Sequence, residues 1–360
     1  MLELAPSWGM RTHKEDPVAN KTDKTLRAGV IGLGQGAKHA YAYANAPEYE
    51  LVAVCDLKPE VLDAVWDKGR LERGSAKQYT DHKEMIEKEN LDVVSVSVPD
   101  DYHTGPVCDA SNAGVKGIFC EKPICINLKD ADLMIETVER NGTKMSVDHT
   151  RSFLPSYQAV RKEIRAGKIG GLTRIVQHMG GARSMLFRNG THAVDSICFF
   201  ADADPIWVIA AHEQGFEDYG IEYKGEGGKD PALDPGSTVI IEFANGVCGI
   251  LNSAKKTASI WEIDLIGPGG RYYLTDQEVT AWRTDVPEGK ANLDPSFKFP
   301  GYPEFFGDVL IPAVKEMAQM VWNDAESSSP PRRARNTLEI MMGALLSQSR
   351  DSAKVHLPLP

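Results

Sequence analysis

Short apolar runs alternate with longer amphipathic segments in the first half of the chain. The apolar runs, rich in β-branched residues and typical of buried strands, lie at 26–31, 51–55, 91–98, 117–120 and 144–147. Segments with a helical pattern lie between them, at 35–46, 81–89, 104–113 and 128–140. Strands that alternate with helices of ~10–15 residues predict βαβ units. We therefore expect an α/β domain with a doubly wound parallel sheet.

The second half of the chain has a different pattern. After a helix predicted over 157–166, longer strand-like runs occur at 173–178, 206–211, 238–243, 248–253 and 260–266. Asn245-Gly246 joins two of these runs, and this dipeptide is typical of tight hairpins. A final helix is predicted over 338–349. Consecutive hairpins predict a mostly antiparallel sheet with one face available for packing.

Length and composition narrow the class of protein. A chain of 360 residues is long for one core, so we predict an arm at 1–26 and two domains, at 27–150 and 151–360. The formal net charge of −11 argues against a nucleic-acid partner. No apolar run approaches the ~20 residues of a membrane helix, so no membrane partner is expected. Two long loops, at 213–237 and 283–307, could border a site or an interface.

The six cysteines include no CxxC pair, which argues against a zinc ribbon or a redox dithiol. Several lie inside apolar runs, where buried free thiols of a reducing cytoplasm are the plain interpretation. His149, His178 and His192 could in principle gather a metal ion, but they lack helical ligand spacing. No metal is therefore expected.

A glycine-rich turn follows the first predicted strand and opens the first helix. It consists of Gly32, Leu33, Gly34, Gln35, Gly36 and Ala37. Gly32 would allow the tight turn, Gly34 would let a pyrophosphate approach the backbone, and Ala37 would still permit close helix–strand packing. The free N–H groups of Gln35 and Gly36 at the helix start would then face the phosphates. The turn predicts a dinucleotide site.

Asp56 indicates which dinucleotide is bound. It ends the second strand, ~20 residues further on, where an acid accepts hydrogen bonds from the adenosine ribose hydroxyls. A carboxylate there would repel a 2′-phosphate, so NAD is favoured over NADP. Lys58, two residues away, could partly offset that charge.

Further motifs resemble a known family. They are Val98-Pro99-Asp100-Asp101-Tyr102-His103, Glu121-Lys122-Pro123, Asn189-Gly190-Thr191-His192, Gly267-Pro268-Gly269-Gly270 and the closing Val355-His356-Leu357-Pro358-Leu359. Over roughly residues 27–359 the chain resembles the glucose–fructose oxidoreductase, inositol dehydrogenase and rhizopine catabolism (Gfo/Idh/MocA) oxidoreductases. The resemblance implies a Rossmann domain followed by an α+β domain with a large open sheet.

The resemblance also implies roles for single residues. Lys122 matches the family lysine that touches substrate and cofactor, and His192 matches the catalytic histidine. Pro99, His103 and Glu121 would border the cofactor, and Asn189 the substrate. Asn189 stands where many relatives have an acid, Arg188 stands where some have an aspartate, and Asp100 replaces a common asparagine. These departures leave the proton-transfer partner and the substrate open.

Other candidate residues rest on position alone. Asp195 lies one helical turn beyond His192 and could orient it. His149 and Arg151 follow the sixth predicted strand, where either could bind substrate hydroxyls or form an interdomain salt bridge. Oxidation of a secondary alcohol needs a base of near-neutral pKa and a cation beside the forming alkoxide. Lys122 and His192 would supply the cation and the base.

Three functions follow from these residues. The first is an NAD-dependent oxidoreductase acting on a secondary carbinol of a sugar, glycoside or cyclitol, with pyranose C3 as one position. The second is a glycoside-cleaving enzyme that holds NAD tightly and oxidises the sugar only transiently. The third is a non-catalytic regulator that senses sugar or NAD. A homo-oligomer formed through the C-terminal sheet is also expected, because one face of that sheet has no predicted helices to cover it.

Overall fold

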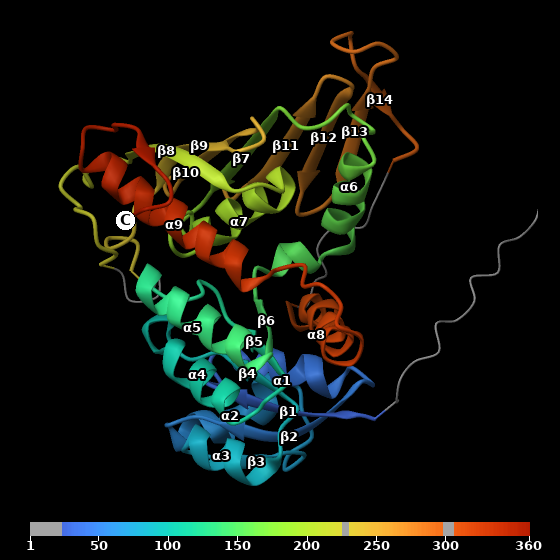
Figure 1. Cartoon of the computed structure of the whole chain (residues 1–360), viewed down its shortest axis with the longest axis vertical. Coiled ribbons are helices and arrows are strands. Elements are labelled where there is room, and N and C mark those ends of the chain that lie inside the picture. Colours follow the sequence, from blue (N-terminus) through green and yellow to red (C-terminus); the bar gives the residue numbers. More distant parts are fainter. Residues whose placement is uncertain (1–23, 225–229, 298–305) are drawn as a thin grey trace, which may run out of the picture.

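The computed structural model describes residues 24–224, 230–297 and 306–360 (Figure 1). Most of the predicted arm, at 1–23, lies outside the described residues. Parts of the two predicted loops, at 225–229 and 298–305, also lie outside them. In Figure 1 the described chain forms two bodies, each built on one sheet, with several helices between them.

The first sheet has six strands in the order β3-β2-β1-β4-β5-β6. They are β1 (Leu26–Ile31), β2 (Tyr49–Cys55), β3 (Lys77–Tyr79), β4 (Val93–Val96), β5 (Gly117–Cys120) and β6 (Lys144–Val147). Every neighbouring pair is parallel. This strand order is that of the Rossmann fold, which confirms the predicted doubly wound sheet.

Helices cover both faces of this sheet. They are α1 (Gly36–Ala44), α2 (Pro59–Lys68), α3 (His82–Glu89), α4 (Thr104–Asn112) and α5 (Leu128–Asn141). Asn127 caps α5, since its side chain accepts a hydrogen bond from Asp130 N at 2.9 Å, and Gly142 ends the helix in the left-handed conformation (φ 68°). Helix α2 and strand β3 were not predicted.

The second sheet has nine strands in the order β14-β13-β12-β11-β7-β10-β9-β8-β15. They are β7 (Arg174–Gly180), β8 (Pro205–His212), β9 (Ser237–Phe243), β10 (Cys248–Ala254), β11 (Trp261–Gly267), β12 (Gly270–Thr275), β13 (Val279–Arg283), β14 (Asn292–Asp294) and β15 (Val355–His356). All neighbours are antiparallel except β7 and β10. The predicted large, mostly antiparallel sheet is confirmed, although β12 to β15 were not predicted.

One face of the second sheet is covered by helices. In Figure 1, α6 (Pro155–Arg165), α7 (Gly190–Ala201) and α9 (Pro331–Gln348) lie between this sheet and the first domain. Two short 3₁₀ helices, η1 (Asp100–Tyr102) and η2 (Thr150–Phe153), follow β4 and β6. None of the helices within the described ranges is long and apolar enough to cross a membrane.

The opposite face of the second sheet carries an apolar row. Val176, Ile250, Ile240 and Ile209 are half-buried and stand in register on β7, β10, β9 and β8. Their chain neighbours are buried on the helix-covered face, as strand alternation requires. The row therefore lies on the side of the sheet that the helices leave open.

Helix α8 (Phe306–Asn323) was not predicted, and it returns to the first domain. Leu310, Val314 and Met317 are fully buried in the same apolar cluster as Val30 and Phe119. These side chains recur at helical spacing, so the signal was present, but Pro312 inside the helix obscures it. A segment from beyond residue 150 thus completes the core of the N-terminal sheet.

Candidate active site

The glycine-rich turn has the geometry of a phosphate-binding loop. Gly32 has φ +82°, and a Cβ there would lie 2.5 Å from the carbonyl oxygen of Ser97. A Cβ at Gly36 would lie 2.9 Å from Val30 Cγ1, so Gly36 brings α1 against β1, and Ala37 is buried behind it. At Gly34, by contrast, a Cβ would meet no described atom within 4 Å. Gly34 and Gln35 are exposed, which leaves the backbone at the start of α1 open to a ligand.

Asp56 lies at the carboxyl end of β2, next to this turn. Its Oδ2 accepts a hydrogen bond from Leu33 N at 2.9 Å, and its Oδ1 accepts one from Lys58 N at 3.0 Å. A carboxylate has about four lone-pair sites, so acceptor capacity remains for a ribose diol. Asp56 thereby fixes the turn and fits the role predicted for it toward NAD.

His103 has a different environment from the one predicted. Its side chain is 0% exposed. Nδ1 lies 3.0 Å from Pro123 O and 3.1 Å from Ile124 O, and Nε2 lies 2.9 Å from Val98 O. We therefore assign His103 to holding together the loops after β4 and β5, in place of the predicted cofactor contact. Pro99, one residue after Val98, is exposed at the carboxyl end of β4.

A cavity of about 300 Å³ lies where the two domains meet. Its walls come from the start of α1, the carboxyl ends of β4, β5 and β6, and the segment before α7. It is lined by Gln35, Lys38, Ser97, Val98, Asp100, Glu121, Lys122, Asp148, Thr150, Arg151, Arg183, Arg188, Asn189 and His192. The predicted catalytic pair, Lys122 and His192, therefore faces one cavity together with Gln35 of the glycine-rich turn.

Lys122 is held from both domains. Its backbone N–H donates to Glu121 Oε2 at 3.0 Å, and its Nζ donates to the carbonyl oxygen of Arg188 at 2.8 Å. Burial lowers the pKa of Lys122 to about 8, assisted by the positive charge of Arg188 and opposed by Glu121 and Asp100. The side chain consequently carries its proton at neutral pH and is able to lose it just above.

His192 lies in the first turn of α7. Burial, reinforced by the charges of Lys122 and Arg151, lowers its pKa well below the ordinary value, so the ring is neutral at pH 7. Its Nδ1 is buried and lacks a hydrogen-bond partner among the described residues. A neutral imidazole with an unused nitrogen at a cavity wall can accept a proton from a substrate.

His149 lies behind His192 and orders that wall. The two rings are perpendicular, with centroids 6.0 Å apart. His149 Nε2 is 3.2 Å from Thr191 Oγ1, and its Nδ1 is 3.3 Å from Asp195 Oδ1. The Asp195 carboxylate accepts hydrogen bonds from Arg333 Nε at 2.8 Å and from Ser152 Oγ at 2.9 Å, so its hydrogen bonds go to these two side chains in place of the predicted His192. With 1% of its surface exposed, His149 supports the wall rather than contacting substrate.

Arg151 and Asn189, the other predicted substrate residues, do line the cavity. Arg151 Nη2 donates to Asp276 Oδ1 at 3.0 Å, and its guanidinium carbon lies 3.3 Å from the centre of the Trp261 ring. This ion pair lies within the predicted domain 151–360, so it is not the interdomain salt bridge that the sequence left as an alternative. Asn189 precedes α7, and its carbonyl accepts from His192 N at 3.0 Å.

A buried polar cluster lies behind Lys122, and the sequence analysis missed it. His39 Nε2 is 3.3 Å from Glu121 Oε1 and 3.6 Å from Asp148 Oδ2, and His39 Nδ1 is 3.1 Å from Ser95 Oγ. Burial and the charge of Glu121 raise the pKa of Asp148 to about 7, while the pKa of Glu121 is lowered to about 2. Asp148 accordingly titrates near neutral pH beside a permanently charged Glu121.

The same cluster contains three side chains that could together bind a metal ion. One ligand atom each from His39, Glu121 and Asp148 lie within 4.8 Å of one another. This set differs from the three histidines that the sequence singled out, of which His178 alternates with buried neighbours and faces the open side of β7. The only signal for the set was position, because Glu121 and Asp148 follow adjacent strands whose carboxyl ends meet at one edge.

Comparison with known proteins agrees with this geometry. A family described as "Oxidoreductase family, NAD-binding Rossmann fold" matches residues 26–149. The inositol 2-dehydrogenase of Salmonella paratyphi B is 33% identical over 149 residues, which cover 41% of this chain and 43% of that enzyme. The D-glucoside 3-dehydrogenase of Escherichia coli K12 is 28% identical over 253 residues, covering 64% and 70%.

Similar folds extend over nearly the whole chain. An oxidoreductase from Agrobacterium radiobacter, solved in complex with NAD+, L-tartaric acid and magnesium, has a TM-score of 0.74 at 17% identity, covering 92% of this chain and 98% of its own. The family match over residues 26–149 shows that the N-terminal domain is an NAD-binding Rossmann domain. Over residues 26–149 the chain matches the model of the Gfo/Idh/MocA oxidoreductase family. Its match to the first curated relatives spans less than half of their length.

Proposed function

We propose that the protein is an NAD-dependent oxidoreductase that transfers hydride between NAD and a secondary carbinol of a sugar, glycoside or cyclitol, with pyranose C3 as one position. The observation that supports it is the shared cavity, which Gln35, Lys122 and His192 line together. When bound, NAD supplies the hydride acceptor or donor. The glycine-rich turn and Asp56 would hold it at the carboxyl edge of the sheet.

Two side chains would perform the acid–base chemistry. During alcohol oxidation the neutral His192 would take the hydroxyl proton, while the Lys122 ammonium would stabilise the negative charge on the carbinol oxygen. The carbonyl of Arg188 would hold that ammonium at one place. Arg151 and Asn189 would bind other hydroxyls and so orient the reacting carbon.

The redox-neutral alternative uses the same residues. There the sugar would be oxidised only transiently before elimination of the glycosidic group, and NAD would stay bound through the cycle. Release of NADH distinguishes the two, since only the dehydrogenase releases it at every turnover. A non-catalytic regulator is not favoured, because it would have no use for a buried lysine and a neutral histidine that face one cavity.

The decisive test is a substrate panel. Purified protein would be incubated with NAD and, in turn, myo-inositol, free hexoses and alkyl glucosides, with NADH followed by absorbance and products by mass spectrometry. We expect one compound class to give NADH at many turnovers per active site. Glycoside cleavage without accumulated NADH would establish the alternative. Neither NADH nor product from any compound would refute the proposal.

We also propose that the protein is a cytoplasmic homo-oligomer. The in-register row of Val176, Ile250, Ile240 and Ile209 supports association through the open face of the second sheet. Closed symmetric assembly through one shared patch is the common outcome for such a face.

A further inference from the structure

A buried carboxylate holds the segment that precedes α7. Asp234 is fully buried, and its carboxylate accepts hydrogen bonds from two successive backbone amides, Phe187 N at 3.1 Å and Arg188 N at 3.1 Å. Leu186 N donates to the neighbouring Pro235 O at 2.8 Å. Three consecutive amides are therefore tied to one short stretch of the 213–237 loop.

The same segment contacts the proposed catalytic lysine. The Arg188 residue that donates its N–H to Asp234 also accepts a hydrogen bond through its carbonyl from Lys122 Nζ, at 2.8 Å. One residue thus separates the buried carboxylate from the ammonium group. Any movement of the Arg188 backbone would move the acceptor that fixes Lys122 in the cavity.

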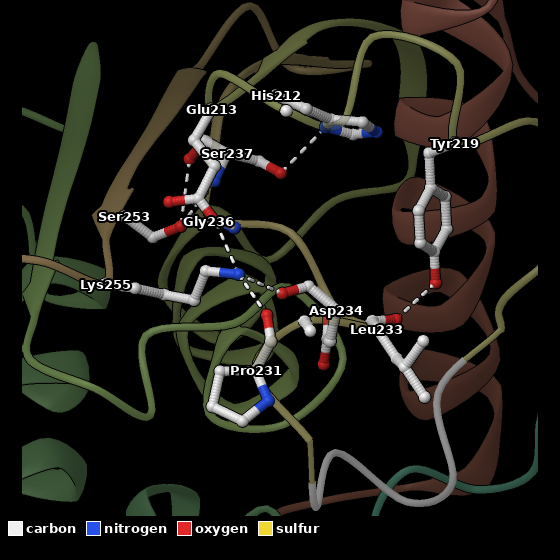
Figure 2. A network of polar contacts seen from close by, with 12 residues as sticks. His212, Glu213, Tyr219, Pro231, Leu233, Asp234, Gly236, Ser237, Ser253 and Lys255 are labelled. Atoms are coloured by element: carbon white, nitrogen blue, oxygen red, sulfur yellow. Dashed lines mark hydrogen bonds and ion pairs between the residues drawn. The ribbon is translucent and has the colours of Figure 1, made fainter.

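Lys255, the residue after β10, extends its side chain to the loop that carries Asp234 (Figure 2). Its Nζ donates to Asp234 O at 2.8 Å and to Pro231 O, and it lies 2.5 Å from Glu213 Oε1. Glu213 in turn accepts from Gly236 N at 3.0 Å. The Lys255 side chain is only 9% exposed, so its ammonium is largely buried among these acceptors. The loop that carries Asp234 is thereby fastened to the second sheet.

We propose that Asp234 is a positioning residue for Lys122, acting through the Arg188 peptide, and this rests on the proposed function of Lys122. The carboxylate is fully buried beside two donors, an arrangement that fixes both amides in one orientation. It links the second domain to a side chain of the first. Glu213 and Lys255 secure the carboxylate's own backbone through hydrogen bonds to Gly236 N and Asp234 O.

The test compares Asp234→Asn and Asp234→Ala with the control Asp218→Asn, which removes an exposed charge from the same loop. Assays run at pH 8, because burial raises the pKa of Asp234 to about 7 and the carboxylate is then largely ionised. A misplacement of about 1 Å at a reacting group costs about 10²-fold. We expect kcat to fall by about that factor in Asp234→Ala and by less in Asp234→Asn, whose amide oxygen still accepts one N–H. The Kd of both Asp234 variants for NAD should stay within about 2-fold of wild type. The kcat of the control Asp218→Asn should also stay within about 2-fold.

A second readout needs no substrate. The pH dependence of Lys122 acetylation by acetic anhydride, followed by mass spectrometry, reports the pKa of that amine. In both Asp234 variants it should shift below the wild-type value of about 8, because the ammonium loses a nearby anion and a fixed acceptor. A shift upward toward 10.5 would show that the site has merely opened to water, and that result would overturn the positioning role.

The two proposals fail in different ways. If wild-type protein turns over no compound of the panel but the Lys122 pKa falls in the Asp234 variants, positioning stands and the proposed reaction is wrong. If kcat and the Lys122 pKa are both unchanged in Asp234→Ala, positioning is refuted whatever the reaction. If Asp234→Ala does not fold, Glu213→Gln provides the test, because it weakens the ion pair with Lys255. This variant should lower the Lys122 pKa by a smaller amount, and an unchanged pKa would refute the positioning role of Asp234.

Discussion

Replacement of Lys122 by methionine separates its charge from its packing. Methionine keeps an unbranched, apolar side chain of similar length, so it suits a buried position and removes only the ammonium. With a pKa of about 8, the wild-type amine is roughly 90% protonated at pH 7. If that charge stabilises the forming alkoxide, Lys122→Met should lower kcat by ~10²–10⁴-fold. NAD affinity should fall less than kcat, because the glycine-rich turn and Asp56, which would hold most of the dinucleotide, remain intact in this variant.

The pH profile of the wild-type enzyme tests the sign of this reasoning. An ammonium that must be charged is lost as pH rises through about 8, so kcat should fall about tenfold per pH unit above that value. His192 is already neutral below pH 7, and its limb therefore lies on the acid side. A rate that instead rises through pH 8 would identify Lys122 as the base. Wild-type turnover in Lys122→Met, with NADH measured by absorbance, would exclude the residue from the chemistry.

Three further predictions concern the cofactor, the base and assembly. Asp56→Ala should raise the Kd for NAD about 10-fold and narrow the preference over NADP, measured by calorimetry; tighter binding of NADP by the wild type would contradict the role of Asp56. His192→Ala should lower kcat by ~10²-fold or more and remove the acid-side limb of the pH profile, whereas an unchanged limb would place the base elsewhere. Light scattering should report at least twice the 39.5 kDa chain mass, and Ile240→Asp on the apolar row should dissociate the assembly; a monomeric wild type at micromolar concentration would refute it.

Local patterns predicted most of the fold. The strands at β1, β4, β5 and β6 are continuous apolar runs because both faces of a parallel sheet are buried, and the helices between them predict that these strands are parallel. Helix α8 was not predicted, because a proline in the sequence usually indicates a helix end. No local pattern shows that residues after 305 pack on the first sheet. Contacts between residues far apart in the sequence determine where this helix packs, and no local pattern predicts them.

Some residues of the candidate site were likewise indicated by the sequence, and others were not. Gly32, Gly34 and Asp56 were predicted as cofactor residues because a phosphate and a ribose diol require those residue types at that spacing. His103 was misassigned, since a histidine at the start of a helix looks the same in sequence whether it faces a ligand or two carbonyls. Asp234 had no signal, because its partners are backbone amides 46 and 47 residues away and any sequence supplies those.

The two ends of Lys122 show how such a site divides its tasks between domains. The backbone of Lys122 is fixed within the first domain by Glu121, which also contacts His39 on the helix that follows the glycine-rich turn. Its ammonium is fixed by Arg188, which belongs to the second domain and is held there by Asp234. The contacts with Glu121 hold the lysine backbone at the carboxyl edge of the first sheet, where the cofactor would bind. The contact with Arg188 holds the ammonium beside the second domain, where the substrate would bind. Because Asn189 and His192, for which we propose substrate contacts, follow Arg188 within one helical turn, a change in the 213–237 loop would move the proposed cation and base together while the glycine-rich turn stays in place.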